Sequence, residues 1–253
     1  MKYIGAITGD IIGSIYEWDN IKTTEFPLFD NDCFFTDDSV LTLATMDAIT
    51  NNIPYEIAYH KFATNYPGRG YGGGFSRWLH SDLKPYNSYG NGAGMRVSPV
   101  GWAFDTSEEV IHQATESAKV THNHPEGIKG AQATALSVFL ARTGKSKDDI
   151  RYIIEETFGY NLHRTCDEIR PTYTFNETCQ GTVPEAIIAF LDSTDFENAI
   201  RLAISLGGDS DTLACITGGI AEAFYGEVPK HISDEVERLL PPELLYIIKN
   251  FNN

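Results

Sequence analysis

The sequence has 253 residues, a formal net charge of −16 at pH 7, and 42% hydrophobic and 12% aromatic residues. This composition supports a substantial core and excludes a disordered chain. The acidic balance argues against a broad nucleic-acid or anionic-membrane surface, because phosphate contacts require clustered Lys and Arg.

Neither a membrane span nor a disulfide framework is indicated. No stretch approaches the ~18 consecutive apolar residues of a transmembrane helix, and the first residues lack a signal-peptide pattern. The four cysteines show no CxxC spacing. We therefore predict reduced, mostly buried thiols in a cytoplasmic protein.

Helical periodicity runs from end to end. In the first predicted helix, residues 3–16, Gly5, Gly9 and Gly13 recur four apart and share one face, where we expect another helix to approach closely. Further helices are predicted for residues 40–49, 55–64, 108–120, 130–142, 148–158, 184–191, 196–206, 211–225, 233–240 and 242–251. The sequence thus predicts one all-α domain covering residues 1–253.

Some helix ends carry local signals. Two motifs resemble capping boxes, Ser146-x-x-Asp149 and Thr194-x-x-Glu197. Pro184 and Pro242 are predicted at first helical positions. Strand signals are scarce, and residues 172–175 are interpreted as a short strand or as extended chain.

Two acidic clusters lie far apart in the sequence, each directly before an apolar helical run: Thr36-Asp37-Asp38 and Asp209-Ser210-Asp211-Thr212. Either cluster alone is typical of helix N-capping. If folding joins them, two like charges about 4 Å apart repel by ~4 kcal/mol at an effective dielectric of ~20, and a cation is needed between them. Oxygen ligands of this kind suit Mg²⁺, Mn²⁺ or Ca²⁺ better than zinc.

A long irregular region, residues 65–106, is rich in glycine, and such a segment is usually functional. Residues 69–74 and 88–96 offer backbone N–H groups to a phosphate, although neither is a P-loop or dinucleotide fingerprint and plain turns explain them too. His122 and His124 follow a predicted helix. They are interpreted as hydrogen-bonding or stacking residues at a site wall, or as helix-end residues, because a zinc site needs further ligands.

Together these segments resemble the ADP-ribosylhydrolase family, the all-α, dinuclear-metal group typified by the dinitrogenase reductase-activating glycohydrolase. The matching motifs occur in the family's order and span nearly the whole chain, at residues 5–17, 35–39, 91–97, 121–125 and 207–212. The resemblance implies an orthogonal helical bundle with a cleft that binds two divalent ions, Mg²⁺ or Mn²⁺.

The resemblance also assigns roles by position. The implied metal ligands are Thr36, Asp37, Asp38, Asp209, Asp211 and Thr212. Glu17 takes the catalytic position beside the metals, and Asp38 is assigned to catalysis as well. The implied ADP-ribose-binding residues are Gly70, Tyr71, Gly72, Ser88, Tyr89, Gly90, Asn91 and His122. Tyr89 and His122 are expected to be aromatic walls of the nucleotide site.

The implied reaction is hydrolysis of the glycosidic bond at C1 of the distal ribose, which releases ADP-ribose from a protein or a small molecule. Positive charge develops at C1 in such reactions, and Glu17 would move a proton to the leaving group or from the attacking water. Five carboxylates against two divalent ions leave −5 against +4, so we expect the site to form poorly without metal.

The first glycine loop resembles that of the branch that cleaves O-linked conjugates, including serine, because the arginine-cleaving branch tends to carry an aspartate there. Other interpretations stay open: an arginine-ADP-ribose or O-acetyl-ADP-ribose hydrolase of this fold, a non-catalytic ADP-ribose-binding module, or a helical protein whose acids only cap helices. We expect neither membrane nor nucleic acid as a partner, and a monomer or small homo-oligomer.

Overall fold

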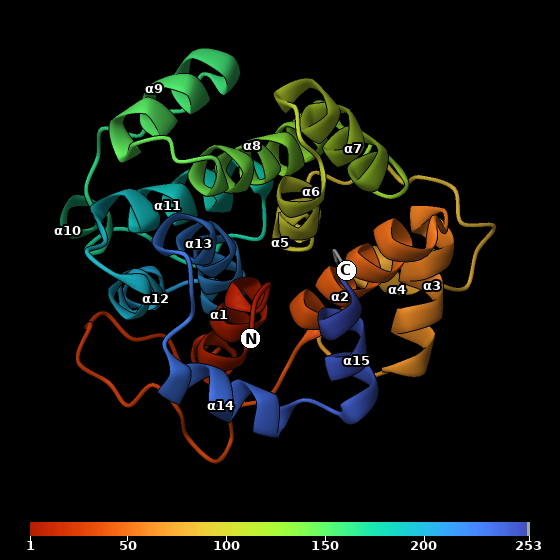
Figure 1. Ribbon diagram of the computed structural model, residues 1–253, viewed down its shortest axis with the longest axis horizontal. Helices are drawn as coiled ribbons and strands as arrows, with labels where there is room; N and C mark the ends of the chain where they lie inside the picture. Colours follow the sequence, from red (N-terminus) through yellow and green to blue (C-terminus); the bar gives the residue numbers. More distant parts are fainter. Residues whose placement is uncertain (252–253) are drawn as a thin grey trace.

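The computed structural model describes residues 1–251 and is almost entirely helical over that range (Figure 1). The helices, in chain order, are α1 (Gly5–Gly13), the 3₁₀ turn η1 (Ser14–Tyr16), α2 (Asp37–Asn51), α3 (Tyr55–Asn65), α4 (Gly73–Trp78), α5 (Gly92–Met95), α6 (Ser98–Ala103), α7 (Ser107–Lys119), α8 (Pro125–Arg142), α9 (Lys147–Phe158), α10 (Cys166–Ile169), α11 (Cys179–Asp192), α12 (Phe196–Ser205), α13 (Ser210–Tyr225), α14 (Lys230–Leu239) and α15 (Pro242–Asn250). They form the expected orthogonal helical bundle.

Helix α13 lies at the centre of the molecule. Its residues from Ser210 to Ala223 are all buried, as expected of a helix that is apolar on every side. It contacts α1, α8, α11 and α12, which surround it in Figure 1. The buried apolar side chains form one continuous core around it.

The glycine stripe on α1 lets the two helices α1 and α13 come into close contact. A Cβ atom on Gly9 would lie 1.9 Å from the backbone oxygen of Ala214, and one on Gly5 would lie 2.3 Å from that of Gly218. Any larger side chain would therefore force the helices apart. The expectation of a close helix approach is confirmed, and this contact sets the position of the N-terminus of α13.

Two of the predicted helix starts are confirmed and another is wrong. Ser146 and Asp149 form the predicted capping box of α9, and Pro242 begins α15. The predicted box at Thr194 is wrong, because Asp195 caps α12 instead and accepts a 2.8 Å hydrogen bond from the Asn198 N–H.

The expected helix start at Pro184 is wrong, and of the two alternatives for residues 172–175 the strand is not formed. Pro184 lies inside α11, which begins earlier because Thr178 caps it through the Gly181 N–H. Residues 172–175 form no strand, and the one β-bridge among the described residues joins Gly90 and Thr178. The long region from residue 65 to residue 106 is also less irregular than expected, since it contains α4, α5 and α6.

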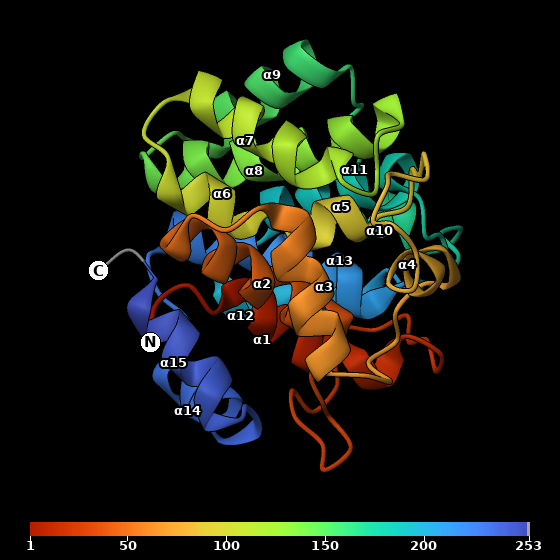
Figure 2. The same ribbon diagram turned by 90° about the vertical axis from the view of Figure 1, so that its right-hand side faces the viewer.

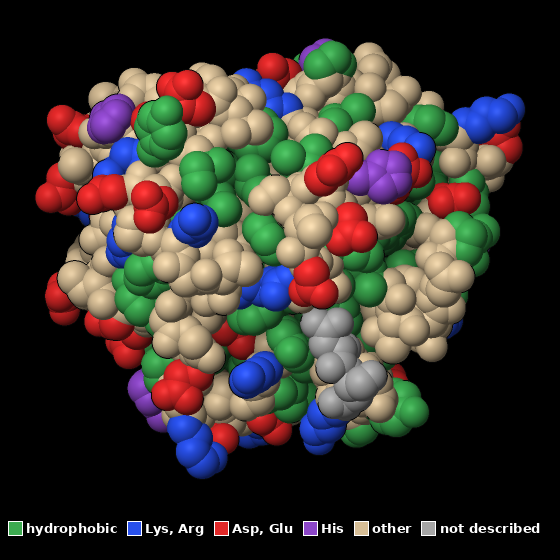
Figure 3. Space-filling model, turned by 45° about the horizontal axis from the view of Figure 1, so that its top comes forward, with side chains coloured by type: hydrophobic (Ala, Val, Ile, Leu, Met, Phe, Trp, Pro, Cys, Tyr) green, Lys and Arg blue, Asp and Glu red, His purple; other side chains and the backbone are tan. Residues whose placement is uncertain are grey.

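The two ends of the described chain lie together: the Tyr3 and Phe251 rings are 5.1 Å apart, and Figure 2 shows the N-terminus beside α15. The four cysteines are buried and free, as predicted. Within residues 1–251, no helix is both long and apolar enough to cross a membrane. On the face shown in Figure 3, basic side chains are scattered among acidic ones.

Candidate metal centre and cleft

The N-termini of α2 and α13 meet and bring the two acidic clusters together at one end of a cleft of about 250 Å³. The other walls come from the glycine-rich loops before α4 and α5. The cleft is lined by Glu17, Asp37, Asp38, Leu41, Gly70, Gly72, Gly73, Gly74, Phe75, Tyr86, Ser88, Gly90, Asn91, Gly92, Met95, Arg96, His122, Glu177, Asp209, Asp211 and Thr212.

A buried carboxylate on α1 fixes the first cluster. Asp10 accepts hydrogen bonds from the Thr36 N–H at 2.9 Å and the Thr36 hydroxyl at 2.6 Å, and from the Ser39 N–H at 3.1 Å and the Ser39 hydroxyl. The Thr36 hydroxyl in turn accepts from the Asp38 N–H as the N-cap of α2. Helices α1 and α2 are thereby joined at the base of the cleft.

The carboxylates form two overlapping groups. Asp10, Asp38 and Asp211 place one oxygen each within 4.8 Å of one another, and so do Glu17, Asp209 and Asp211. Asp211 belongs to both groups, as a ligand shared by two cations would. At an effective dielectric of ~20, two charges at that separation repel by about 3.5 kcal/mol, so the ionised cluster requires a positive counter-charge.

The residues fit a hard divalent cation. The Asp38 Oδ1 atom is buried and has no hydrogen-bond partner, which is costly for a carboxylate oxygen unless a ligand completes it. The surrounding donors are carboxylate and hydroxyl oxygens, the set that Mg²⁺ and Mn²⁺ prefer. Asn91 orients one of them by donating a 2.6 Å hydrogen bond from its side-chain amide to Asp209.

Burial and mutual repulsion raise the pKa values of these acids. Burial, followed by the charge of Asp10, raises the pKa of Asp37 and of Asp38 well above the usual range. Burial and then Asp209 do the same for Asp211. Burial also raises the pKa of Asp10 to about 6. A cation that binds this cluster therefore competes with protons.

Glu17 lies at the edge of this cluster, half-buried at the end of η1. Burial and then the charges of Asp209, Asp10 and Glu177 raise the pKa of Glu17 to about 7, while a hydrogen bond with the Trp18 side chain lowers it. A carboxyl group with a pKa near neutrality is suited to both donating and accepting a proton.

The loop that carries Glu17 is tied to the second acidic cluster. The Asn20 side-chain amide donates to the Tyr16, Glu17 and Gly208 carbonyl oxygens at 2.7, 2.8 and 2.8 Å. The Gly208 N–H donates back to Asn20 Oδ1 at 2.7 Å. Glu17 and Asp209 are thus held in a fixed relationship, although 192 positions separate them in the chain (209 − 17).

Glycine backbone and one cation complete the walls of the cleft. Gly70 has φ +99°, and a Cβ atom there would lie 3.2 Å from Asp37 Oδ1, so glycine lets this loop approach α2. Arg96 is fully buried and donates from Nη2 to the Ser117 carbonyl at 3.1 Å and the Thr121 hydroxyl at 2.8 Å. Its Nε and Nη1 atoms have no partner. Its positive charge lies at the wall of an otherwise acidic cleft.

His122 lies beneath the second glycine loop. Burial and the charge of Arg96 hold its pKa well below the usual range, so the ring is neutral. Its Nδ1 atom is 2.7 Å from the Thr121 hydroxyl. Its Nε2 atom would be 3.3 Å from a Cβ atom on Gly92, so the ring supports the loop closely.

Most of the residues predicted from the resemblance line the cleft: Glu17, Asp37, Asp38, Gly70, Gly72, Ser88, Gly90, Asn91, His122, Asp209, Asp211 and Thr212. Thr36 points instead towards Asp10. Tyr71 and Tyr89 lie outside the lining. Tyr71 donates to the Tyr66 carbonyl and Tyr89 packs against His124.

Three residues of the site were not singled out as functional from the sequence. Asp10 interrupts the apolar run of the first helix, and that signal was available in the sequence. Arg96 lies inside a quoted motif as its one basic residue. Glu177 has no local signal, and enters the cleft because the Asn91 N–H bonds to its carbonyl at 2.7 Å.

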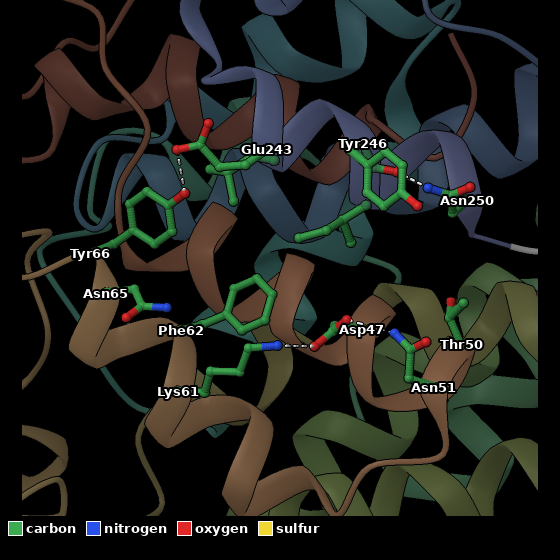
Figure 4. A pocket seen from close by; sticks show the side chains of 12 residues that line it. Asp47, Thr50, Asn51, Lys61, Phe62, Asn65, Tyr66, Glu243, Tyr246 and Asn250 are labelled. Carbon is green, nitrogen blue, oxygen red and sulfur yellow. Dashed lines mark hydrogen bonds and ion pairs between the residues drawn. The ribbon is translucent and has the colours of Figure 1, made fainter.

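A second hollow of about 500 Å³ lies between α2, α3 and α15, away from the acidic cluster (Figure 4). Its charged and polar groups largely bind one another. Asp47 accepts from Lys61 at 3.1 Å and from Asn51 at 2.7 Å, and Tyr66 donates to Glu243 at 3.1 Å. The chemistry of the molecule is therefore concentrated in the first cleft.

The protein is an all-α bundle whose central helix places clustered acids, a donor set for a divalent cation, in a glycine-lined cleft. A solved structure described as "ADP-ribosylglycohydrolase-related protein complex" has this fold, with a TM-score of 0.72 at 22% identity over 98% of this chain and 95% of its own. The ADP-ribosylglycohydrolase family model matches residues 3–250. The chain belongs to the ADP-ribosylglycohydrolase family and is a glycosidic-bond hydrolase.

Individual relatives agree with this assignment. ADP-ribosylhydrolase ARH3 from Xenopus tropicalis is 27% identical over 88% of this chain and 86% of its own length. The protein of the same name from Homo sapiens is 27% identical over 89% and 85%. ADP-ribosylarginine hydrolase Tri1 from Pseudomonas putida is 27% identical over 59% of this chain and 43% of its own.

Proposed function

We propose that the protein is a divalent-metal-dependent hydrolase that cleaves the bond between C1 of the distal ribose of ADP-ribose and an O-linked acceptor, serine in particular. The single observation that carries the proposal is the sharing of Asp211 by two carboxylate groups, one of which contains Glu17. This arrangement supports a pair of cation sites with Glu17 beside them as the proton-transferring group.

The polarity of the cleft orients the substrate. The anionic diphosphate is repelled by the carboxylates and fits against the glycine loops, where backbone N–H groups and the Arg96 charge lie. The distal ribose then reaches the carboxylate groups. Its C1 atom, and the acceptor attached to it, come next to Glu17.

Asp38, Asp209 and Asp211 would hold the cations, with Asp37, Thr36 and Thr212 completing or supporting the ligand set. Bound there, Mg²⁺ or Mn²⁺ supplies charge neutralisation and Lewis acidity to the ribose hydroxyl groups. Glu17 donates a proton to the departing acceptor oxygen or removes one from the attacking water, as the bond to C1 breaks with oxocarbenium character.

The preference for an O-linked acceptor rests on two observations. The first glycine loop, residues 69–74, contains no acidic residue. The relatives named ADP-ribosylhydrolase ARH3 align over most of their length, whereas the relative named as an arginine hydrolase aligns over 43% of its own.

The test is release of free ADP-ribose from matched serine-linked and arginine-linked peptides, with Mg²⁺, with Mn²⁺ and with a chelator. We expect metal-dependent release from the serine conjugate. Glu17→Gln should bind ADP-ribose and metal while turnover falls by about 10²-fold or more. Release from the arginine peptide alone would overturn the acceptor assignment, and ADP-ribose binding without any release would identify a binding module.

A further inference from the structure

Two aromatic side chains form an exposed stack beside Glu17. The Trp18 and Phe175 rings lie 5.0 Å apart with an interplanar angle of 23°. Trp18 is 78% exposed and Phe175 is 37% exposed. Pairing reduces the apolar area of each ring in water but leaves one contiguous outer surface, which we call the aromatic ledge. Apolar surface held in this way commonly marks an interaction site.

The ledge is built on anchored backbone. On one side, the Asn20 amide holds the Glu17 carbonyl to the Gly208 loop. On the other, Asn176 Oδ1 accepts from the Thr178 N–H at 2.9 Å and from the Thr178 hydroxyl at 2.7 Å. Lys22 ties the two sides together, since its ammonium group donates to the Tyr173 carbonyl at 2.7 Å. A preorganised surface loses little conformational entropy on binding.

The ledge is continuous with the reactive end of the cleft. Glu17 precedes Trp18, Glu177 follows Phe175 by two positions, and both glutamates line the cleft. If the diphosphate lies against the glycine loops and C1 faces Glu17, the acceptor leaves C1 beside the residue that precedes Trp18. The polypeptide attached to the acceptor atom then lies within reach of the ledge.

The charge around the ledge selects the sign of its partner. Asp19, Glu17 and Glu177 flank the two rings, and Asp19 and Glu177 are exposed. Lys22 contributes little to the surface charge offered to a ligand, because its ammonium group is bound to the Tyr173 and Leu206 carbonyl oxygens. An aromatic face with nearby carboxylates attracts Lys and Arg side chains.

We propose that the aromatic ledge of Trp18 and Phe175 docks the acceptor polypeptide, and that it favours a segment with Lys or Arg within two residues of the modified side chain. This inference rests on the proposed function, from which it takes the position of the acceptor. It adds a determinant for the polypeptide that is separate from the recognition of ADP-ribose.

The test compares three serine-linked substrates under saturating Mg²⁺: a peptide with Lys beside the modified serine, the same peptide with Glu there, and ADP-ribosyl N-acetylserine amide. The quantity measured is the ratio of kcat/KM for each peptide to that for the single-residue conjugate. This ratio cancels any effect of a substitution on Glu17 itself. We expect Trp18→Ala and Phe175→Ala to lower the Lys-peptide ratio on the order of five-fold.

Matched variants separate docking from general damage. Trp18→Phe should keep most of the Lys-peptide ratio, and Tyr152→Ala, at a 65% exposed aromatic residue on α9, should leave it unchanged. The Glu peptide should show a low ratio in all variants. Equal Lys-peptide ratios in the wild type, Trp18→Ala and Phe175→Ala would overturn the proposal that the ledge docks the polypeptide.

A binding measurement makes the ledge testable apart from catalysis. The unmodified Lys peptide is titrated into the protein with ADP-ribose and Mg²⁺ present, and we expect Trp18→Ala to weaken its binding on the order of five-fold. If no substrate is hydrolysed but this difference persists, the proposed function fails and the ledge stands. If substrates are hydrolysed but Trp18→Ala and the wild type bind the peptide equally, the ledge fails alone.

Discussion

The Asp10 carboxylate accepts two hydrogen bonds from Thr36, one from its N–H at 2.9 Å and one from its hydroxyl at 2.6 Å. Through them a carboxylate on α1 sets the first turn of α2, which carries Asp37 and Asp38. Since α1 is itself pressed against α13 through its glycine face, the same helix positions both acidic clusters. The acidic cluster is therefore assembled around α1.

Replacing Asp10 should weaken both metal binding and folding. Asp10→Ala removes the acceptor of the buried Thr36 and Ser39 N–H groups, which costs about 1–3 kcal/mol per orphaned group. Loss of such a supporting carboxylate typically weakens metal affinity about 10–100-fold. Calorimetric titration with Mn²⁺ and urea unfolding in chelator measure the two effects. Asp105→Ala, whose side chain is 92% exposed, should change neither, and wild-type Mn²⁺ affinity in Asp10→Ala would contradict this role.

Metal removal should destabilise the protein, because a cation that binds only the folded state stabilises that state. A cation present at 100 times its Kd stabilises the fold by about 2.7 kcal/mol, or about 5–10 °C in Tm for a chain of this size. Asp211→Ala should abolish most of this Mg²⁺-dependent shift, since Asp211 belongs to both groups. Glu243→Ala, in the second hollow, should keep it. A Tm that is the same in chelator and in Mg²⁺ would argue against the metal centre.

Adding one methyl group at Gly9 should be strongly destabilising. Its Cβ atom would lie 1.9 Å from the Ala214 carbonyl oxygen, and backbone cannot move aside cheaply. We expect Gly9→Ala to lower the free energy of unfolding by about 3 kcal/mol or more. Gly72→Ala is the matched control for stability, since Gly72 has φ −56° and no atom within 4 Å of an added Cβ atom. Equal urea midpoints for the two variants would show that the helices separate easily.

Glu222 should make stability depend on pH. Its carboxylate accepts the Tyr3 and Gly5 N–H groups at 2.7 and 2.6 Å, but burial, the larger effect, raises its pKa from 4.5 to about 7. The folded state thus holds this proton more tightly than the unfolded state. The resulting stabilisation is fully present below pH 4.5 and is lost as the pH rises through 7. Urea unfolding in Mg²⁺ at several pH values from 5 to 8 should show a smaller decline for Glu222→Gln than for the wild type. Parallel declines would exclude Glu222 as the cause.

Features that depend on neighbours within about one helical turn can be predicted from the sequence alone. The all-α class, the capping box at Ser146, the proline start of α15 and the glycine face of α1 all follow from such spacing, and the structure has each of them. The motifs were also sufficient to identify the family, because five different short segments occur along the chain in the family's order. Where local signals competed, as at Thr194 and Asp195, the sequence-based choice was wrong by one residue.

Which of these segments meet depends on the tertiary fold. Asp211 belongs to both carboxylate groups because α13 contacts both α1 and α2. Glu177 reaches the cleft because its carbonyl oxygen accepts a hydrogen bond from the Asn91 N–H. Trp18 and Phe175 stack across 157 positions of sequence (175 − 18). No local pattern encodes such contacts. They arise from the burial of apolar helix faces, which is non-directional and depends on the whole chain at once.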